Sequence, residues 1–96
     1  MIEIKQQHEQ LLLVGDLTRK TVNSAFEKKA SLLISKEITL LDLSAVSRVD
    51  TAGLAWLLLV LEQVQKQHQE IHFVNIPQEL IKLAKISAVD TFLPIK

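Results

Sequence analysis

Short apolar runs alternate along this chain with longer segments in which apolar residues recur at helical spacing. Residues 38–43 and 71–76 are apolar runs of strand length, and a helical segment lies between them. A strand–helix–strand order implies right-handed crossovers and parallel pairing at the centre of a sheet. We therefore predict an α/β domain in which helices pack on a mixed sheet. The almost unbroken apolar character of 38–43 further predicts a strand that is covered on both faces.

The first segments predict a hairpin. Ile2 and Ile4 alternate with charged residues, as in a half-buried strand, and the apolar run 11–14 stops at Gly15. Residues 2–15 therefore read as two paired strands.

The periodicity predicts three helices, over residues 18–34, 51–68 and 77–86. Thr18 suits the N-cap of the first helix, and Pro77 suits the first turn of the third. The last residues, 89–95, are apolar enough to pack back on the domain. The predicted order is β-β-α-β-α-β-α.

Composition limits both the size and the function. The chain has 96 residues, of which 48% are hydrophobic, which suits a single domain over 1–96. Eleven basic residues balance eleven acidic ones, so nothing indicates a nucleic-acid partner or direct membrane binding. The longest apolar run, 52–61, is about half of the ~20 residues that span a bilayer. With no cysteine and no signal-peptide pattern at the N-terminus, we expect a small, soluble, cytoplasmic protein.

Residues that carry catalytic or metal chemistry are sparse. The two glycines stand alone, so there is no phosphate-binding loop and no nucleophile elbow. His68 and His72 flank a predicted turn and do not share a helical face, as zinc ligands at that spacing would. Asp42 and Asp50 lie on either side of a loop, with no second acid nearby in the sequence. We predict no enzymatic activity, no metal and no cofactor.

One stretch, residues 42–54, leads a strand into a loop and then into a helix. Asp50 or Thr51 can cap that helix, whose first N–H groups form at most a weak anion site. Judged by spacing alone, this pattern is explained by a capped helix start that follows a strand and a loop, with no functional role.

The second predicted helix has too many apolar positions for one buried face. At 100° per residue, Leu57, Leu58, Leu61, Val60 and Val64 form a core stripe. A second stripe points elsewhere and consists of Ala52, Ala55, Trp56 and Leu59. On this reading Trp56 anchors an exposed protein interface. Two alternatives stay open: Trp56 curls sideways into the core, or the helix is sandwiched between the sheet and residues 89–95.

Leu-Asp-Leu-Ser at 41–44, followed by Val-Asp-Thr-Ala-Gly-Leu at 49–54, resembles the signature of STAS domains. This is the fold of bacterial anti-sigma-factor antagonists and of sulfate-transporter tails, and it has the same element order. The likeness covers nearly the whole chain. It implies a STAS-like mixed β-sheet with helices packed on it.

Within that family, the chain most resembles the STAS subunit of phospholipid-transporting ABC complexes that maintain outer-membrane lipid asymmetry. The resemblance implies a non-enzymatic subunit that binds and regulates or stabilises the cytoplasmic ATPase. It would lie on the inner face of the inner membrane, reaching the membrane only through its complex. Together with the helix pattern, it predicts a partner-binding site of Asp50, Thr51, Ala52, Gly53, Ala55, Trp56 and Leu59.

An alternative function is an anti-sigma-factor antagonist switched by phosphorylation at Thr51, which occupies the position phosphorylated in that class. Many antagonists carry an acid two or three residues after the glycine that ends the second strand. Here Asp16 directly follows Gly15. This departure favours a contact role for Thr51.

Overall fold

The computed structural model describes residues 1–34 and 37–94. The elements in chain order are β1 (Ile2–Gln7), β2 (Gln10–Leu17), α1 (Ser24–Leu33), β3 (Leu40–Val49), α2 (Thr51–Lys66), β4 (His72–Val74), α3 (Gln78–Ile86) and a 3-10 turn, η1 (Asp90–Phe92). This confirms the predicted order β-β-α-β-α-β-α. None of the helices in these residues is long and apolar enough to cross a membrane.

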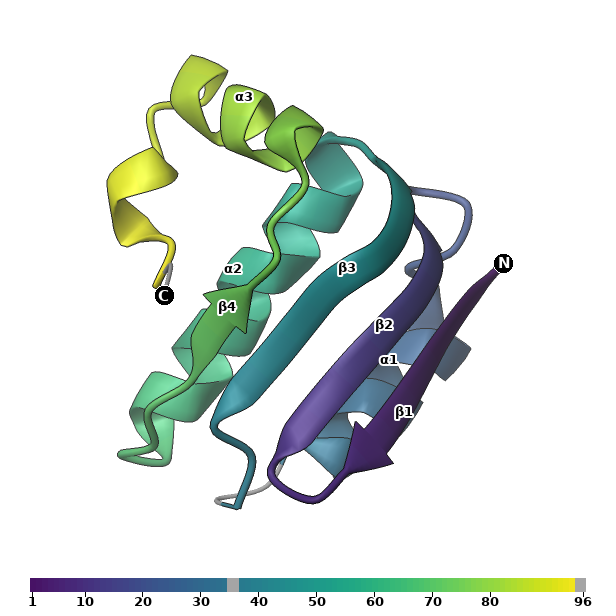
Figure 1. Cartoon of the computed structure of the whole chain (residues 1–96), viewed down its shortest axis with the longest axis vertical. Helices are drawn as coiled ribbons and strands as arrows, with labels where there is room; N and C mark the ends of the chain where they lie inside the picture. The colour runs from purple at the N-terminus through teal and green to yellow at the C-terminus, as the bar shows by residue number, and fades with distance from the viewer. Residues whose placement is uncertain (35–36, 95–96) are drawn as a thin grey trace.

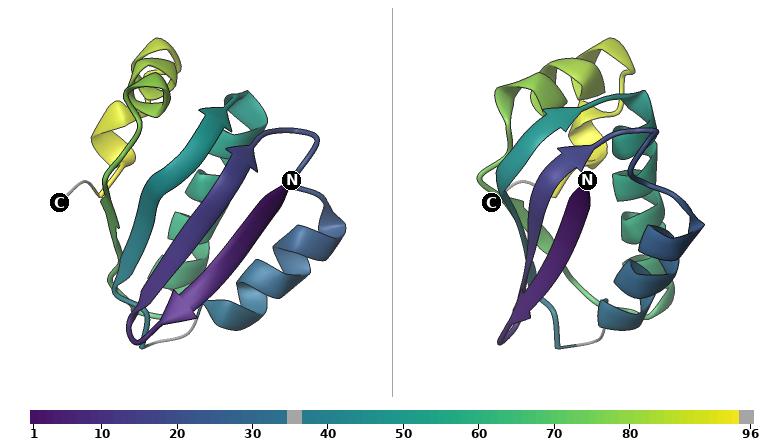
Figure 2. Two further views of the ribbon diagram at one scale, coloured as in Figure 1. Left: turned by 45° about the vertical axis from the view of Figure 1, so that its right-hand side comes forward. Right: turned by 90° about the vertical axis from the view of Figure 1, so that its right-hand side faces the viewer.

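The four strands form one mixed sheet in the order β1-β2-β3-β4 (Figure 1). β1 and β2 pair antiparallel, which confirms the hairpin, whereas β2–β3 and β3–β4 are parallel pairs. Helices α1 and α2 lie side by side on the same face of the sheet (Figure 2). Since β2 and β3 run in the same direction, the loops that follow them meet at one end of the sheet.

The core lies between that face and the two helices. Along β2 and β3, the side chains that point toward the helices are fully buried, as at Leu13, Leu41 and Leu43. Those that point the other way, such as Leu40 and Asp42, are half-buried. The expectation that this strand is covered on both faces is therefore wrong. Its burial alternates with a period of two, as in a sheet whose helices lie on one face.

The first helix starts later than predicted, at Ser24, with Asn23 as its N-cap. The side-chain oxygen of Asn23 accepts the N–H of Phe26 at 2.9 Å. Thr18 instead begins a turn, because its carbonyl oxygen accepts the N–H groups of Thr21 (3.0 Å) and Val22 (2.9 Å). Strand β2 extends to Leu17, so the chain needs this turn to reverse direction before the helix can pack on the sheet.

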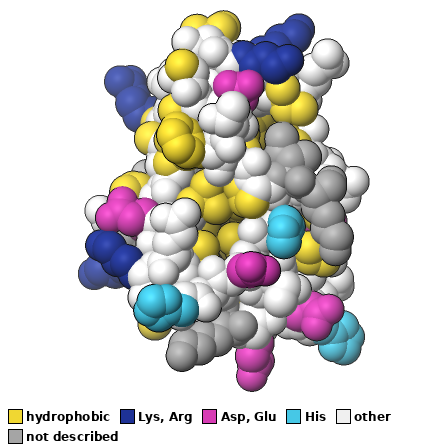
Figure 3. Space-filling view, turned by 90° about the vertical axis from the view of Figure 1, so that its left-hand side faces the viewer, with side chains coloured by type: hydrophobic (Ala, Val, Ile, Leu, Met, Phe, Trp, Pro, Cys, Tyr) yellow, Lys and Arg dark blue, Asp and Glu magenta, His cyan; other side chains and the backbone are white. Residues whose placement is uncertain are grey.

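The C-terminal segment, up to residue 94, packs along the outer edge of strand β4. Leu93 is buried, and the N–H of Phe73 donates to the carbonyl oxygen of Pro94 at 2.8 Å. The segment thus packs back as predicted up to residue 94, and residue 95 lies outside the described residues. Figure 3 faces this side and shows hydrophobic side chains in a hollow. Leu61 and Phe92 line a pocket together with residues that flank β4. Pro77 is the N-cap of α3, one residue before the helix begins.

Candidate partner-binding site

Asp50 organises the corner where β3 passes into α2. One carboxylate oxygen, Oδ1, accepts the N–H of Gly53 at 3.0 Å and so caps the helix. The other, Oδ2, accepts the N–H of Arg19 at 3.0 Å from the loop that follows β2. A single side chain thereby ties the β2–α1 loop to the first turn of α2.

The β2–α1 loop is also held from within. The Thr21 hydroxyl donates to the carbonyl oxygen of Asp16 at 2.7 Å and accepts the N–H of Thr18 at 3.0 Å. Thr21 is buried, so water does not compete freely for these bonds. The β2–α1 loop at the corner is therefore fixed in the fold.

The environment of Asp50 favours its ionised form. Partial burial alone would raise the pKa of this carboxyl group, but three backbone N–H groups and the charge of Arg19 outweigh it. The N–H donors belong to Arg19, Gly53 and Ala52, and the net effect is a pKa below the ordinary value. A carboxylate whose oxygens accept backbone N–H groups in this way stabilises the fold and is a poor general base.

We expect Asp50→Ala to lower the free energy of unfolding at neutral pH by about 1–2 kcal/mol, because the helix cap is lost and the Arg19 N–H loses its acceptor. Urea denaturation followed by circular dichroism measures this change.

Asp50→Asn is the matched control, since Asn also caps helices but carries no charge. A carboxyl group with a lowered folded-state pKa stabilises the protein above the unfolded-state value of 3.8. That stabilisation disappears as the pH falls through the folded-state pKa. The advantage of wild type over Asp50→Asn should therefore be present at about pH 7 and shrink below about pH 4. An advantage that grows on acidification would contradict this assignment.

The structure separates the predicted site residues by exposure. Thr51, Ala55 and Leu59 are exposed along one side of α2, and Leu59 retains 57% of its accessible surface. Ala52 is half-buried and Gly53 is buried. The exposed residues recur every four positions, so they form one continuous strip that starts at the corner.

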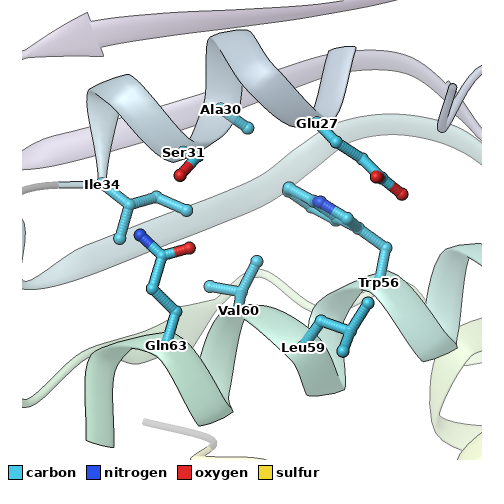
Figure 4. Close-up of a pocket in the computed structure, with 8 residues that line it drawn as sticks. All are labelled: Glu27, Ala30, Ser31, Ile34, Trp56, Leu59, Val60 and Gln63. Carbon is cyan, nitrogen blue, oxygen red and sulfur yellow. The ribbon is translucent and has the colours of Figure 1, made fainter. Parts of the chain in front are cut away.

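Trp56 does not point outward, and the prediction of an exposed anchor is wrong at this residue. It is only 5% exposed, and its ring packs against Phe26 of α1 with centroids 5.0 Å apart. Figure 4 shows the indole extending from α2 toward α1. Because α1 and α2 lie side by side, α2 must bury one flank against α1 as well as its sheet-facing side. The alternative in which Trp56 turns sideways into the core is confirmed.

A shallow pocket of about 190 Å³ lies where the two helices meet (Figure 4). Ala30 of α1 and the C-cap residue Ile34 line one side, and Trp56, Leu59 and Val60 of α2 line the other. The exposed strip on α2 therefore borders a small apolar groove.

Sequence reasoning missed three cations at the corner. Arg19 and Lys20 follow the end of β2, and Arg48 is the penultimate residue of β3. All three border a hollow of about 530 Å³ together with Asp50 and Thr51. A signal was available, because the ends of adjacent parallel strands meet at the same edge of a sheet.

Comparison with known proteins agrees with this architecture. A family model described as "Mlab, STAS domain" matches residues 1–94. The chain is 35% identical over 81 residues to the intermembrane phospholipid transport system binding protein MlaB of Escherichia coli K12 and, equally, to that of Shigella flexneri. These matches cover 84% of this chain and 81% of each relative.

Two anti-sigma-factor antagonists share the fold. One, from Mycobacterium paratuberculosis, superposes with a TM-score of 0.73 at 17% identity, covering 99% of this chain and 83% of its own. The other, SpoIIAA in its unphosphorylated form, gives a TM-score of 0.64 at 14% identity, covering 99% and 86%. The α/β fold class is thereby confirmed as a STAS-like mixed sheet, and the chain belongs to the MlaB-type STAS domain family.

Proposed function

We propose that this chain is a STAS subunit of a phospholipid-transporting ABC complex and that it binds the ATPase subunit of that complex. The 35% identity to MlaB proteins supports the assignment to phospholipid transport. Through this contact the chain regulates or stabilises the ATPase. The complex places the chain at the inner face of the inner membrane.

The observation that carries the proposal is the strip of Thr51, Ala55 and Leu59 along α2. Small residues at the first two positions let a partner backbone approach closely, and Leu59 offers an apolar side chain at 57% exposure. The groove beside Leu59 adds a recess for a partner side chain. Trp56 is not part of this contact surface in our proposal, because it lies beneath the surface between the helices.

We also propose that the chain has no catalytic activity of its own. The carboxylate at the corner, Asp50, is committed to backbone N–H groups of Arg19 and Gly53. Its pKa is lowered, which weakens it further as a base.

A phosphorylation-switched antagonist ranks below this proposal. The hydroxyl-bearing Thr51 is exposed, as modification would require. However, the two antagonists compared above are 17% and 14% identical to this chain, and at that level likeness speaks for architecture alone. Intact-mass measurement after incubation with ATP and candidate kinases separates the two functions.

The test is a binding titration of the purified ATPase subunit against wild type and Leu59→Asp. We expect Leu59→Asp to weaken binding by about 2 kcal/mol, or about thirtyfold, because a buried apolar contact would receive an unpaired charge. ATP hydrolysis by the mixture, measured in parallel, reports any effect on the partner's activity.

Leu32→Asp is the matched control. Leu32 is 85% exposed on α1 and does not line the groove, so the same substitution there should leave binding unchanged. An interface along α2 would be contradicted if both substitutions weakened binding to the ATPase subunit equally. It would also be contradicted if neither substitution weakened that binding.

A further inference from the structure

Three cationic side chains converge on the corner hollow from two segments that are distant in sequence, one a loop and the other the end of a strand. Arg19 and Lys20 come from the β2–α1 loop, and Arg48 comes from the end of β3. All three are exposed, whereas the two acids that line the same hollow, Asp16 and Asp50, are half-buried. An approaching partner therefore meets positive charge first.

Within the described part of the chain, none of these three cations forms an ion pair. Arg48 lies opposite Asp16 in the β2–β3 register, yet the two side chains do not pair. Both oxygens of Asp50 already accept backbone N–H groups, although its charge still acts on Arg19. The guanidinium and ammonium donors thus remain available to a ligand.

The hollow is also held in shape before any partner arrives. Asp50 ties the backbone of Arg19 to α2, and Thr21 closes the rest of the β2–α1 loop. A rigid, cationic recess of this kind lowers the ordering cost of binding an anion.

We propose that the hollow receives an acidic side chain of the ATPase subunit, whose carboxylate pairs with Arg48, Arg19 and Lys20. This inference rests on the proposed function and names the chemistry that the partner presents at the corner. An arginine can bind a carboxylate through two parallel N–H···O bonds, which also orients the partner. Thr51 lines the hollow and is also the first residue of the exposed strip that leads to Leu59, so the polar contact and the apolar contact adjoin there.

A protein carboxylate fits these observations better than an anionic membrane. Segments that bind anionic lipid carry clusters of about four to eight basic residues, whereas the hollow has three cations within a chain of eleven basic and eleven acidic residues. The hollow also adjoins the exposed strip on α2. One protein surface can cover both at once.

The experiment titrates the purified ATPase subunit against wild type, Arg48→Glu and Lys20→Glu at about 50 and about 300 mM NaCl. We expect each reversal to weaken binding about tenfold at low salt and to flatten the salt dependence seen for wild type. Melting curves of each variant establish that it is folded. Lys20→Glu, in an exposed loop, keeps the test decisive if Arg48→Glu fails to fold.

Lys82→Glu on α3 is the matched control, because it changes the net charge equally at an exposed residue outside the hollow. It should bind within about twofold of wild type. Wild-type binding that neither corner reversal weakens would overturn this inference alone. Absence of wild-type binding would overturn the proposed function and the inference with it. Binding to phosphatidylglycerol vesicles that Arg48→Glu abolishes, with unchanged binding to the ATPase subunit, would assign the cations to lipid and overturn the inference.

Discussion

Trp56→Ala should lower the free energy of unfolding by about 3–5 kcal/mol, the loss typical of a large aromatic side chain removed from a core. Trp56 is 5% exposed and packs against Phe26 at a ring-centroid distance of 5.0 Å. Its removal therefore takes away both buried apolar area and an aromatic pair that joins α1 to α2. Urea denaturation followed by far-ultraviolet circular dichroism measures the change without depending on tryptophan fluorescence.

Leu59→Ala serves as the control, three residues further along the same helix. Leu59 is 57% exposed, so its truncation should change the free energy of unfolding by no more than about 0.5 kcal/mol. Binding should depend on the two positions in the opposite way from stability. Folded Trp56→Ala protein should retain more affinity for the ATPase subunit than Leu59→Asp protein does. Equal stability losses in Trp56→Ala and Leu59→Ala would contradict the burial of Trp56.

Gly53→Val should destabilise the fold by about 3 kcal/mol or more, because the added side chain meets a backbone that cannot easily move. A Cβ at residue 53 would clash with the carbonyl oxygen of Leu17 and lie 2.9 Å from its carbonyl carbon. That same oxygen accepts the N–H of Asp50 at 3.3 Å, so β2 cannot withdraw without breaking the corner. Thermal melting of the isolated protein measures the loss.

Ala55→Val controls for the β-branched side chain, since Ala55 is exposed on the same helix. It should cost less than about 1 kcal/mol through helix propensity alone. Gly53→Ala should already lower the melting temperature, because one methyl group is enough to meet Leu17. If Gly53→Val melts like Ala55→Val, the close approach of β2 to α2 does not constrain this residue.

The order of strands and helices could be predicted from the sequence because it depends on the spacing of apolar residues within short segments. Alternating and continuous apolar runs identified the four strands, and helical spacing identified the three helices in the correct order. The loop predicted between residue 43 and the second helix was wrong, because β3 continues to Val49. The start of α1 was predicted too early because Thr18 and Asn23 are both residue types that cap helices. The choice between them depended on where β2 ends, which the local pattern at Thr18 does not contain.

The candidate site was also predictable from the sequence only where it depends on local pattern. Asp50 and Thr51 were both predicted as possible helix caps from their place before an apolar helix, and Asp50 is the residue that caps it. Its second bond, to the N–H of Arg19, joins residues that are 31 positions apart. Such a contact arises from the parallel pairing of β2 with β3, which brings the loop after β2 and the start of α2 to one edge of the sheet.

The residue pattern specified the strands, the helices and the Asp-Thr-Ala-Gly corner, because each depends on spacing within a few residues along the chain. Tertiary packing specified which flank of α2 is buried, since that depends on which helix lies beside it. The helical pattern makes Trp56 and Leu59 neighbours on one apolar stripe, yet α1 covers Trp56 and leaves Leu59 exposed. The same packing collects Arg19, Lys20 and Arg48 around one hollow. A helical wheel describes one helix alone, whereas burial is a property of the assembled layers.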